Sequence, residues 1–163
     1  MFAIGDRVVY PLHGGAIIKS IETKEINGNV HDYYILQMLF ENMVISVPVL
    51  SAERLGMRYV GDKSLLVKVA ATLHEDPDIQ AYKSISWNRR FQLYMESIKS
   101  CDIENVARTY KVLATLEASK KISVGERRLL NNTRQILQSE IMLILDYDLN
   151  QAAAWLEKES KIH

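Results

Sequence analysis

The sequence has one cysteine and no long apolar run, and both shortages exclude a class of protein. Cys101 alone cannot form an internal disulfide, which excludes a small disulfide-bonded scaffold. The apolar runs stop well short of the roughly 20 residues that a membrane-spanning helix needs. The first residues also lack the basic, apolar and small-residue zones of a signal peptide. We therefore expect a cytoplasmic protein.

Residue patterns that carry catalysis are missing as well. The sequence has no Gly-rich phosphate loop, no zinc-ligand spacing and no nucleophile-elbow motif. The histidines stand far apart in the sequence, at His13, His31, His74 and His163. Cys101 adjoins a predicted helix start at Asp102, where backbone N–H groups lower a thiol pKa, but a small residue at a helix junction is the simpler interpretation. We expect no enzyme, no cofactor and no metal ion.

The net charge is zero, but the charges are unevenly distributed. Residues 83–134 carry eleven Lys/Arg and five Asp/Glu, whereas residues 135–163 carry two Lys/Arg and five Asp/Glu. The basic segment could meet phosphate, and the acidic end would keep the chain from binding any polyanion indiscriminately. A solvated helical surface explains the same charges, so the pattern alone does not decide for nucleic acid.

Up to about residue 60 the pattern predicts short strands. Residues 7–10 are β-prone, and His13-Gly14-Gly15 predicts a turn after them. Asn27-Gly28 between two β-prone stretches is the strongest short-range hairpin signal, because both turn positions need φ > 0. Glu41-Asn42 predicts a second tight turn. Four or five short strands joined in this way predict a strongly bent sheet or a small SH3-like barrel.

After Gly61 the apolar spacing becomes helical. About five helices are predicted, beginning near Asp62, Ser86, Asp102, Ser123 and Asp148, with Asp62 and Asp148 as candidate N-caps. Ser123 and Glu126 have the spacing of a capping box. The chain is therefore predicted to be α+β, with a small β-domain over residues 1–60 and an all-helical domain over residues 61–163.

The segment Ser86–Phe91 joins an aromatic ring to positive charge. Trp87 lies in the first turn of a predicted helix and is followed by Asn88, Arg89 and Arg90. Arginine suits phosphate because its planar fork bonds two oxygens, and a flat apolar ring beside it is what a wedge in the minor groove requires. Trp87 also lies four residues before Phe91, in register with the apolar stripe of the helix, and from the residues alone a place in the core is the more common role for such a tryptophan.

A set of short motifs carries a resemblance to a known family. The motifs lie at residues 5–11, 13–14, 21–24, 33–34, 47–48, 56–58, 87–91, 123–130 and 134–137. Together they resemble the CarD/CdnL family of bacterial transcription regulators, whose N-terminal domain also occurs as the polymerase-binding module of the transcription-repair coupling factor. The resemblance covers essentially the whole chain, and the Trp-Asn-Arg-Arg motif favours the stand-alone regulator.

The resemblance implies a Tudor-like N-terminal domain that docks on the β subunit of RNA polymerase. Pairing along an open sheet edge is a natural route for such docking, because an edge strand offers unpaired N–H and C=O groups. Ser46 stands where some family members carry a basic residue, whereas Lys24 keeps its charge, and a missing cation at a rim weakens steering more than it abolishes docking. The implied polymerase-binding residues are Lys24, Ile26, Ser46, Val47 and Pro48.

The resemblance also implies that the helical domain sits at the upstream edge of the transcription bubble. There Trp87 would wedge into the minor groove and stabilise the open complex, with Asn88, Arg89, Arg90 and Arg128 contacting DNA nearby. One alternative is a polymerase-binding adaptor that leaves DNA alone, and another is a nucleic-acid binder that works without polymerase. We expect a monomer, with a dimer formed by exchange of N-terminal strands left open.

Overall fold

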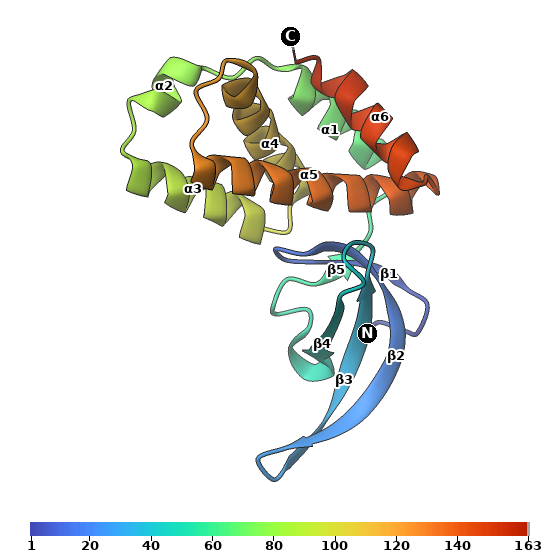
Figure 1. Ribbon diagram of the computed structural model, residues 1–163. Helices are drawn as coiled ribbons and strands as arrows, with labels where there is room; N and C mark the ends of the chain where they lie inside the picture. Colours follow the sequence, from blue (N-terminus) through green and yellow to red (C-terminus); the bar gives the residue numbers. More distant parts are fainter. Residues whose placement is uncertain (163) are drawn as a thin grey trace.

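Five β-strands precede six α-helices in the computed structural model, which describes residues 1–162 and leaves His163 outside the described residues (Figure 1). The strands are β1 (Arg7–Tyr10), β2 (Gly14–Ile26), β3 (Asn29–Met38), β4 (Val44–Pro48) and β5 (Arg58–Tyr59), with a 3-10 helix η1 (Val49–Ser51) before β5. The helices are α1 (Lys63–His74), α2 (Ile79–Lys83), α3 (Trp87–Lys99), α4 (Ile103–Ala118), α5 (Val124–Leu145) and α6 (Leu149–Ser160). The predicted α+β class is confirmed, with one helix more than expected.

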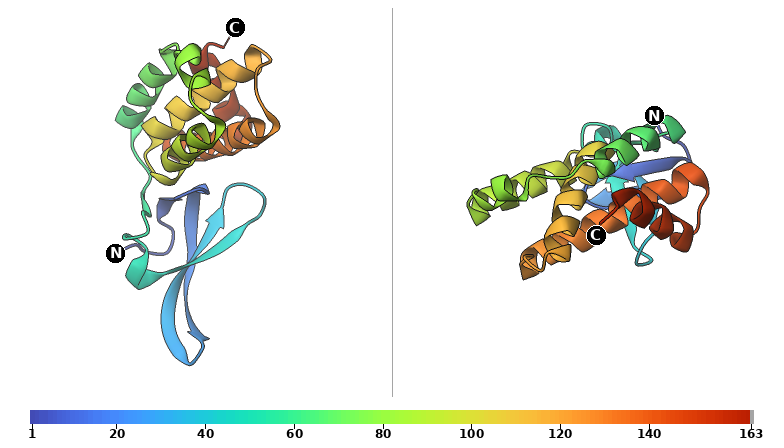
Figure 2. Two further views of the ribbon diagram at one scale, coloured as in Figure 1. Left: turned by 90° about the vertical axis from the view of Figure 1, so that its left-hand side faces the viewer. Right: turned by 90° about the horizontal axis from the view of Figure 1, so that it is seen from above.

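The strands form a single antiparallel sheet in the order β4-β3-β2-β1-β5. No pairing within residues 1–162 joins β4 to β5, so the sheet is open and is not a closed barrel. Asn27 and Gly28 have φ of 53° and 80° and form the predicted two-residue turn between β2 and β3. This long hairpin extends away from the helices (Figure 2). β5 ends at Tyr59 and α1 begins at Lys63, and the domain division at residue 60 stays a prediction.

The turn expected at His13-Gly14-Gly15 was wrong by two residues. The chain turns at Pro11–His13, and Gly14 already pairs with β1 as the first residue of β2. A Cβ built on Gly15 would lie 2.8 Å from Cδ1 of Leu143 and 3.1 Å from the carbonyl oxygen of Ser139. Glycine is needed here because α5 packs directly against β2.

All five predicted helix starts are confirmed, including the N-caps predicted at Asp62 and Asp148 and the capping box predicted at Ser123. Asp62, Ser86, Asp102, Ser123 and Asp148 each accept a hydrogen bond from a backbone N–H in the first turn of the helix that follows. Ser123 and Asp148 complete capping boxes, the first with Glu126 and the second with Gln151. The helix that the sequence did not predict is α2, which is capped by Asp78 and has only five residues, too few for an apolar period.

Each domain has its own hydrophobic core. The buried residues of the helical domain come mainly from α1, α4 and α5, with Leu113, Leu130, Leu137 and Ile141 fully buried. The β-domain buries a smaller cluster that includes Val8, Ile18, Leu36 and Val47. Figure 1 shows α5 running across the base of the helical domain, directly above β1 and β2. Among residues 1–162 no helix is both long and apolar enough to span a membrane.

Candidate functional site

Trp87, the first residue of α3, is 41% exposed at the N-terminal end of that helix. One edge of its indole lies against α5, since a Cβ built on Gly125 would lie 3.2 Å from both Cη2 and Cζ2 of the ring. Phe91 is also 41% exposed, and its ring centroid lies 6.0 Å from that of Trp87. The apolar stripe predicted along this helix is fully buried only at Tyr94 and Ile98. Its first two rings are partly open to solvent.

Arg90 lies over the exposed indole. Its guanidinium carbon is 5.6 Å from the centroid of the Trp87 ring, within the range of a cation–π interaction. Its Nε lies 3.9 Å from Oε2 of Glu126, and the Arg90 side chain is 19% exposed. In residues 1–162 this Nε is buried without a hydrogen-bond partner, so charge attraction holds it toward Glu126. Arg90 therefore stands between a carboxylate and an aromatic ring.

Glu126 supplies this carboxylate from a buried position in the first turn of α5. The Tyr94 hydroxyl donates a hydrogen bond to Oε2 at 2.9 Å, and the backbone N–H of Ser123 donates to Oε1 at 3.3 Å. Burial, together with the hydrogen bond to Glu126, raises the pKa of Tyr94 above its ordinary value. Tyr94 thus remains protonated and keeps donating to Glu126. Glu126, which belongs to the capping box of α5, is in this way connected to Tyr94 on α3.

The other predicted DNA-contacting residues lie on the same two helix ends. Asn88 and Arg89 are exposed on the first turn of α3, and Arg128 is exposed near the beginning of α5. Within residues 1–162 the Arg89 guanidinium donates only to Oε1 of Gln92, at 3.4 Å. The structure therefore brings Asn88, Arg89 and Arg128 near Trp87, and their contact with DNA stays a prediction.

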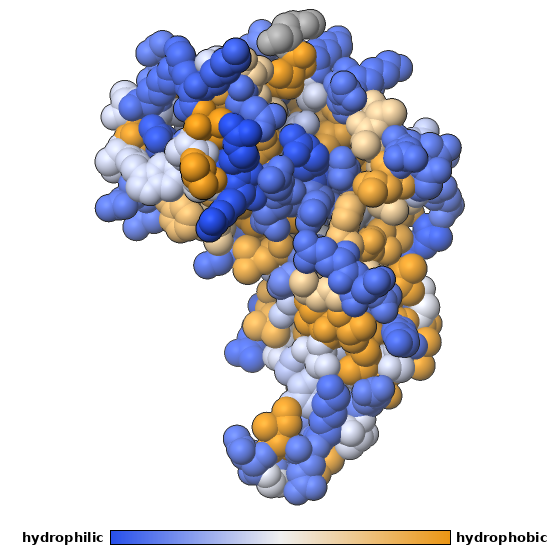
Figure 3. Space-filling model, viewed as in Figure 1, coloured by the Kyte–Doolittle hydropathy of each residue, from blue (hydrophilic) through white to orange (hydrophobic). Residues whose placement is uncertain are grey.

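Further positive charge lies close by. Lys83 ends α2 four residues before Trp87, and Lys121 precedes the first turn of α5. The neighbouring Lys121 side chain lowers the pKa of Lys83, because the two like charges stand close together. In Figure 3 strongly hydrophilic side chains are mixed with pale and hydrophobic ones over the helical domain. The surface around the indole is basic, as a phosphate-facing surface would be.

The predicted docking residues Ser46, Val47 and Pro48 lie on β4, an edge strand of the sheet, whereas Lys24 and Ile26 lie on β2, with β3 between the two strands. Lys24 Nζ donates to Oγ of Ser46 at 2.8 Å and lies 5.7 Å from the centroid of the Tyr33 ring. Ile26, at the end of β2, is 51% exposed. Val47 is fully buried, so only its backbone can contact a partner, whereas Pro48 is half-buried. Lys24 thus lies beside the position where some family members carry a second cation.

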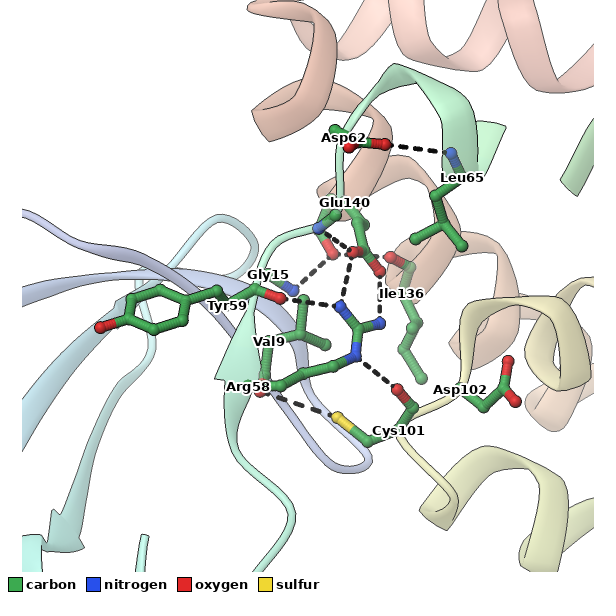
Figure 4. A network of polar contacts seen from close by, with 12 residues as sticks. Val9, Gly15, Arg58, Tyr59, Asp62, Leu65, Cys101, Asp102, Ile136 and Glu140 are labelled. Carbon is green, nitrogen blue, oxygen red and sulfur yellow. Dashed lines mark hydrogen bonds and ion pairs between the residues drawn. The ribbon is translucent and has the colours of Figure 1, made fainter. Parts of the chain in front are cut away.

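A bidentate ion pair joins the two domains (Figure 4). Arg58 of β5 donates from Nη1 and Nη2 to the two carboxylate oxygens of Glu140 on α5, each at 2.8 Å. Arg58 Nε also donates to the Cys101 carbonyl oxygen at 2.7 Å, and the Gly61 N–H donates to Glu140 at 3.1 Å. Burial alone would lower the pKa of Arg58, but the hydrogen bonds and charge of Glu140 outweigh it and raise that pKa. The arginine therefore stays charged at the junction.

Further bonds hold the sheet to α5. The Gly15 N–H donates to Oγ of Ser139 at 2.7 Å. Arg7 Nη1 donates to the Leu143 carbonyl oxygen at 2.6 Å and forms an ion pair with Asp146 at 2.7 Å. Together with the Arg58–Glu140 pair, these contacts join β1, β2 and β5 to α5 and to its C-cap Asp146. They fix the orientation of the helical domain on the sheet.

Sequence reasoning missed three parts of this site. Glu126 was predicted only as a capping residue, and its contacts with Tyr94 and Arg90 were not expected. Gly125 was not singled out, although a glycine in the first turn of a helix is costly and can indicate close packing. The Arg58–Glu140 pair spans 82 positions and leaves no local signal.

Comparisons with known proteins agree with this arrangement. The family model of the CarD C-terminal domain matches residues 68–157, and that of the CarD-like/TRCF RID domain matches residues 2–61. The chain is 28% identical over 144 residues to "Putative transcription factor YdeB" of Bacillus subtilis, covering 88% of this chain and 92% of that protein. The solution NMR structure of the 72-residue N-terminal domain of Myxococcus xanthus CarD is 30% identical over 36% of this chain and 79% of that chain, with a TM-score of 0.32.

Proposed function

Because the chain belongs to the CarD family, we propose that it docks on the β subunit of RNA polymerase and stabilises the promoter open complex through Trp87. The family is one of transcription factors rather than of enzymes, and regulation of transcription through RNA polymerase is the function that membership gives. The β subunit, the contact with promoter DNA and the wedge are the steps proposed for this chain.

The half-exposed indole of Trp87 is the observation that carries the proposal. A tryptophan that only filled the core would be covered, whereas this ring keeps 41% of its surface open among basic side chains. A wedge needs such a ring, because it replaces the base stacking that is lost at an opened step of the minor groove. Arg89 and Arg128 are exposed at the N-terminal ends of α3 and α5, and their guanidinium groups can bind phosphates there.

The energy of base stacking sets the size of the effect expected on promoter opening. A base stacked on an aromatic side chain contributes about 1–3 kcal/mol. A factor that binds the open form better shifts the equilibrium by its differential affinity and no more. One well-placed indole can therefore move promoter opening by about fivefold to a hundredfold. Such a shift matters most at promoters whose open complexes are short-lived.

Docking supplies the local concentration that a weakly basic helical domain lacks on its own. The open edge of β4 offers unpaired backbone groups for strand pairing. Lys24 adds a cation beside that edge, and Ile26 adds an exposed apolar side chain at the hairpin. We expect weak binding to free DNA with little sequence preference, since a wedge and phosphate contacts read shape rather than base edges.

The wedge is tested by the lifetime of the open complex formed with the cognate polymerase. We expect Trp87→Ala to shorten the lifetime by about fivefold or more, because the stacking contribution is lost. Trp155→Phe, a change in the second tryptophan on α6, serves as the control and should leave the lifetime unchanged. Equal lifetimes for Trp87→Ala and wild type, with both proteins folded and docked, would refute the wedge.

Docking is tested separately by capture of the isolated β subunit. Lys24→Glu should weaken capture, whereas Lys19→Glu makes the same charge change at an exposed β2 position away from the hairpin and should not. Unchanged capture by Lys24→Glu would place the docking surface elsewhere. Normal capture combined with no protection of DNA at the upstream bubble edge would favour an adaptor that leaves DNA alone.

A further inference from the structure

We infer that Arg90 and Glu126 position the indole of Trp87, so that the ring is held ready before DNA arrives. The inference rests on the proposed wedge and adds two positioning residues to it. Arg90 was expected to anchor a phosphate, but its charge is already directed inward to Glu126, and its guanidinium lies over the indole. Glu126 is buried and has no access to a DNA backbone.

The contacts form a chain from the core to the exposed ring. Tyr94, which is 2% exposed, donates to Glu126 at 2.9 Å. Glu126 in turn attracts Arg90 Nε at 3.9 Å, and the Arg90 guanidinium carbon lies 5.6 Å from the centroid of the indole of Trp87. Tyr94 and Glu126 are both buried, the Arg90 side chain is partly exposed, and Trp87 is the most exposed of the four. The core thus restrains a side chain that half-faces solvent.

Gly125 allows the indole of Trp87 to pack against α5. Any side chain at this position would begin 3.2 Å from Cη2 and Cζ2 of Trp87, so glycine lets the indole edge approach the backbone of α5. The ring is then bounded by α5 on this edge and by Arg90 over its system of π electrons. A ring restrained in this way loses less conformational entropy when a base stacks on it.

The alternative role for Arg90 is a direct contact with a DNA phosphate. The salt dependence of DNA affinity distinguishes this role from the positioning role. Removing a phosphate contact lowers the slope of log affinity against log salt concentration by about one. Removing a positioning residue lowers affinity without changing this slope. Arg89→Met provides the matched control, because Arg89 is the neighbouring arginine and is exposed.

The first experiment is a double-mutant cycle on open-complex lifetime. We expect Arg90→Met and Glu126→Gln each to shorten the lifetime, the former by about two- to fivefold, as expected for the loss of an exposed cation–π interaction. In a Trp87→Ala background neither change should shorten the lifetime further. Glutamine keeps the capping box and can still accept from Tyr94, so the fold is retained.

The second experiment observes the ring itself, in a Trp155→Phe background where Trp87 is the sole indole. Arg90→Met and Glu126→Gln should lower the fluorescence anisotropy of Trp87 and speed its quenching by acrylamide, while Arg89→Met should change neither. Arg90→Lys keeps a cation and should restore part of the anisotropy.

The results distinguish a failure of the proposed wedge from a failure of the positioning role of Arg90. If Trp87→Ala leaves the lifetime unchanged, the proposed wedge is wrong. If Trp87→Ala shortens the lifetime but Arg90→Met lowers the salt slope by about one and leaves the anisotropy unchanged, Arg90 is a phosphate contact and the positioning role is overturned.

Discussion

Replacing Arg58 by methionine should destabilise the protein more than replacing its partner Glu140 by glutamine. The Glu140 side chain is 1% exposed, whereas that of Arg58 is 31% exposed. Without Arg58, the carboxylate stays buried with the Gly61 N–H, at 3.1 Å, as its remaining hydrogen-bond donor. Leaving a buried charge unpaired costs about 3–5 kcal/mol.

Glu140→Gln leaves a different situation. The Arg58 guanidinium still reaches solvent, still donates to the Cys101 carbonyl oxygen and can donate to the glutamine oxygen. The cost should therefore be about 1–3 kcal/mol, the range for a weakened buried hydrogen bond. The double variant Arg58→Met/Glu140→Leu removes both charges and should regain most of the stability, because an apolar pair of similar volume replaces a buried ion pair at little cost.

The measurement is urea unfolding followed by circular dichroism and by tryptophan fluorescence. Both tryptophans, Trp87 and Trp155, lie in helices, and helices dominate the circular dichroism, so the two probes should give the same curve and both report the stability of the helical side of the junction. A larger loss of stability in Glu140→Gln than in Arg58→Met would refute the reasoning, as would a double variant no more stable than Arg58→Met.

Three shorter predictions follow from other contacts. Burial raises the pKa of the Cys101 thiol to about 11 from 9.0, so iodoacetamide should react slowly with the native protein at pH 8 and rapidly in urea. Because the fold favours the neutral thiol, its contribution to stability should be complete below pH 9 and lost as the pH rises toward 11, which unfolding of wild type and Cys101→Ala would reveal. Gly15→Ala should cost about 1–3 kcal/mol in urea unfolding, since its Cβ would overlap Leu143. Ser123→Ala should cost about 1 kcal/mol in thermal unfolding, and Ser123→Gly only a few tenths, if the cap acts as described.

Features with local causes could be predicted from the sequence. The N-caps at Asp62 and Ser123 need only a side chain and the N–H groups two or three residues later, so the sequence contains all the participants. The hairpin at Asn27-Gly28 likewise depends on two residues that tolerate positive φ. These elements were confirmed at their expected positions.

Features that depend on packing between distant elements could not be predicted. Gly15 gave the signal of a turn, although its lack of a side chain serves the contact with α5 more than 120 positions away. Trp87 matched the apolar stripe of its helix. It is nevertheless half-exposed, because it lies at the end of α3, where the helices cover it on one side alone. Glu126 was recognised as a cap because that role is local, while its contact with Tyr94 depends on how α3 lies against α5.

β2 runs from the base of the helical domain to the tip of the hairpin. Its first residues, Gly14 and Gly15, lie against α5, and its last residue, Ile26, reaches the tip of the hairpin, on the order of 40 Å away for 13 residues. The pairing of β2 with β3 is continuous from Ala16 to Ile26 except for the β-bulge at Lys19. Because side chains alternate between faces along a strand, a single residue inserted beyond the bulge would turn the hairpin over and present its opposite surface to any partner.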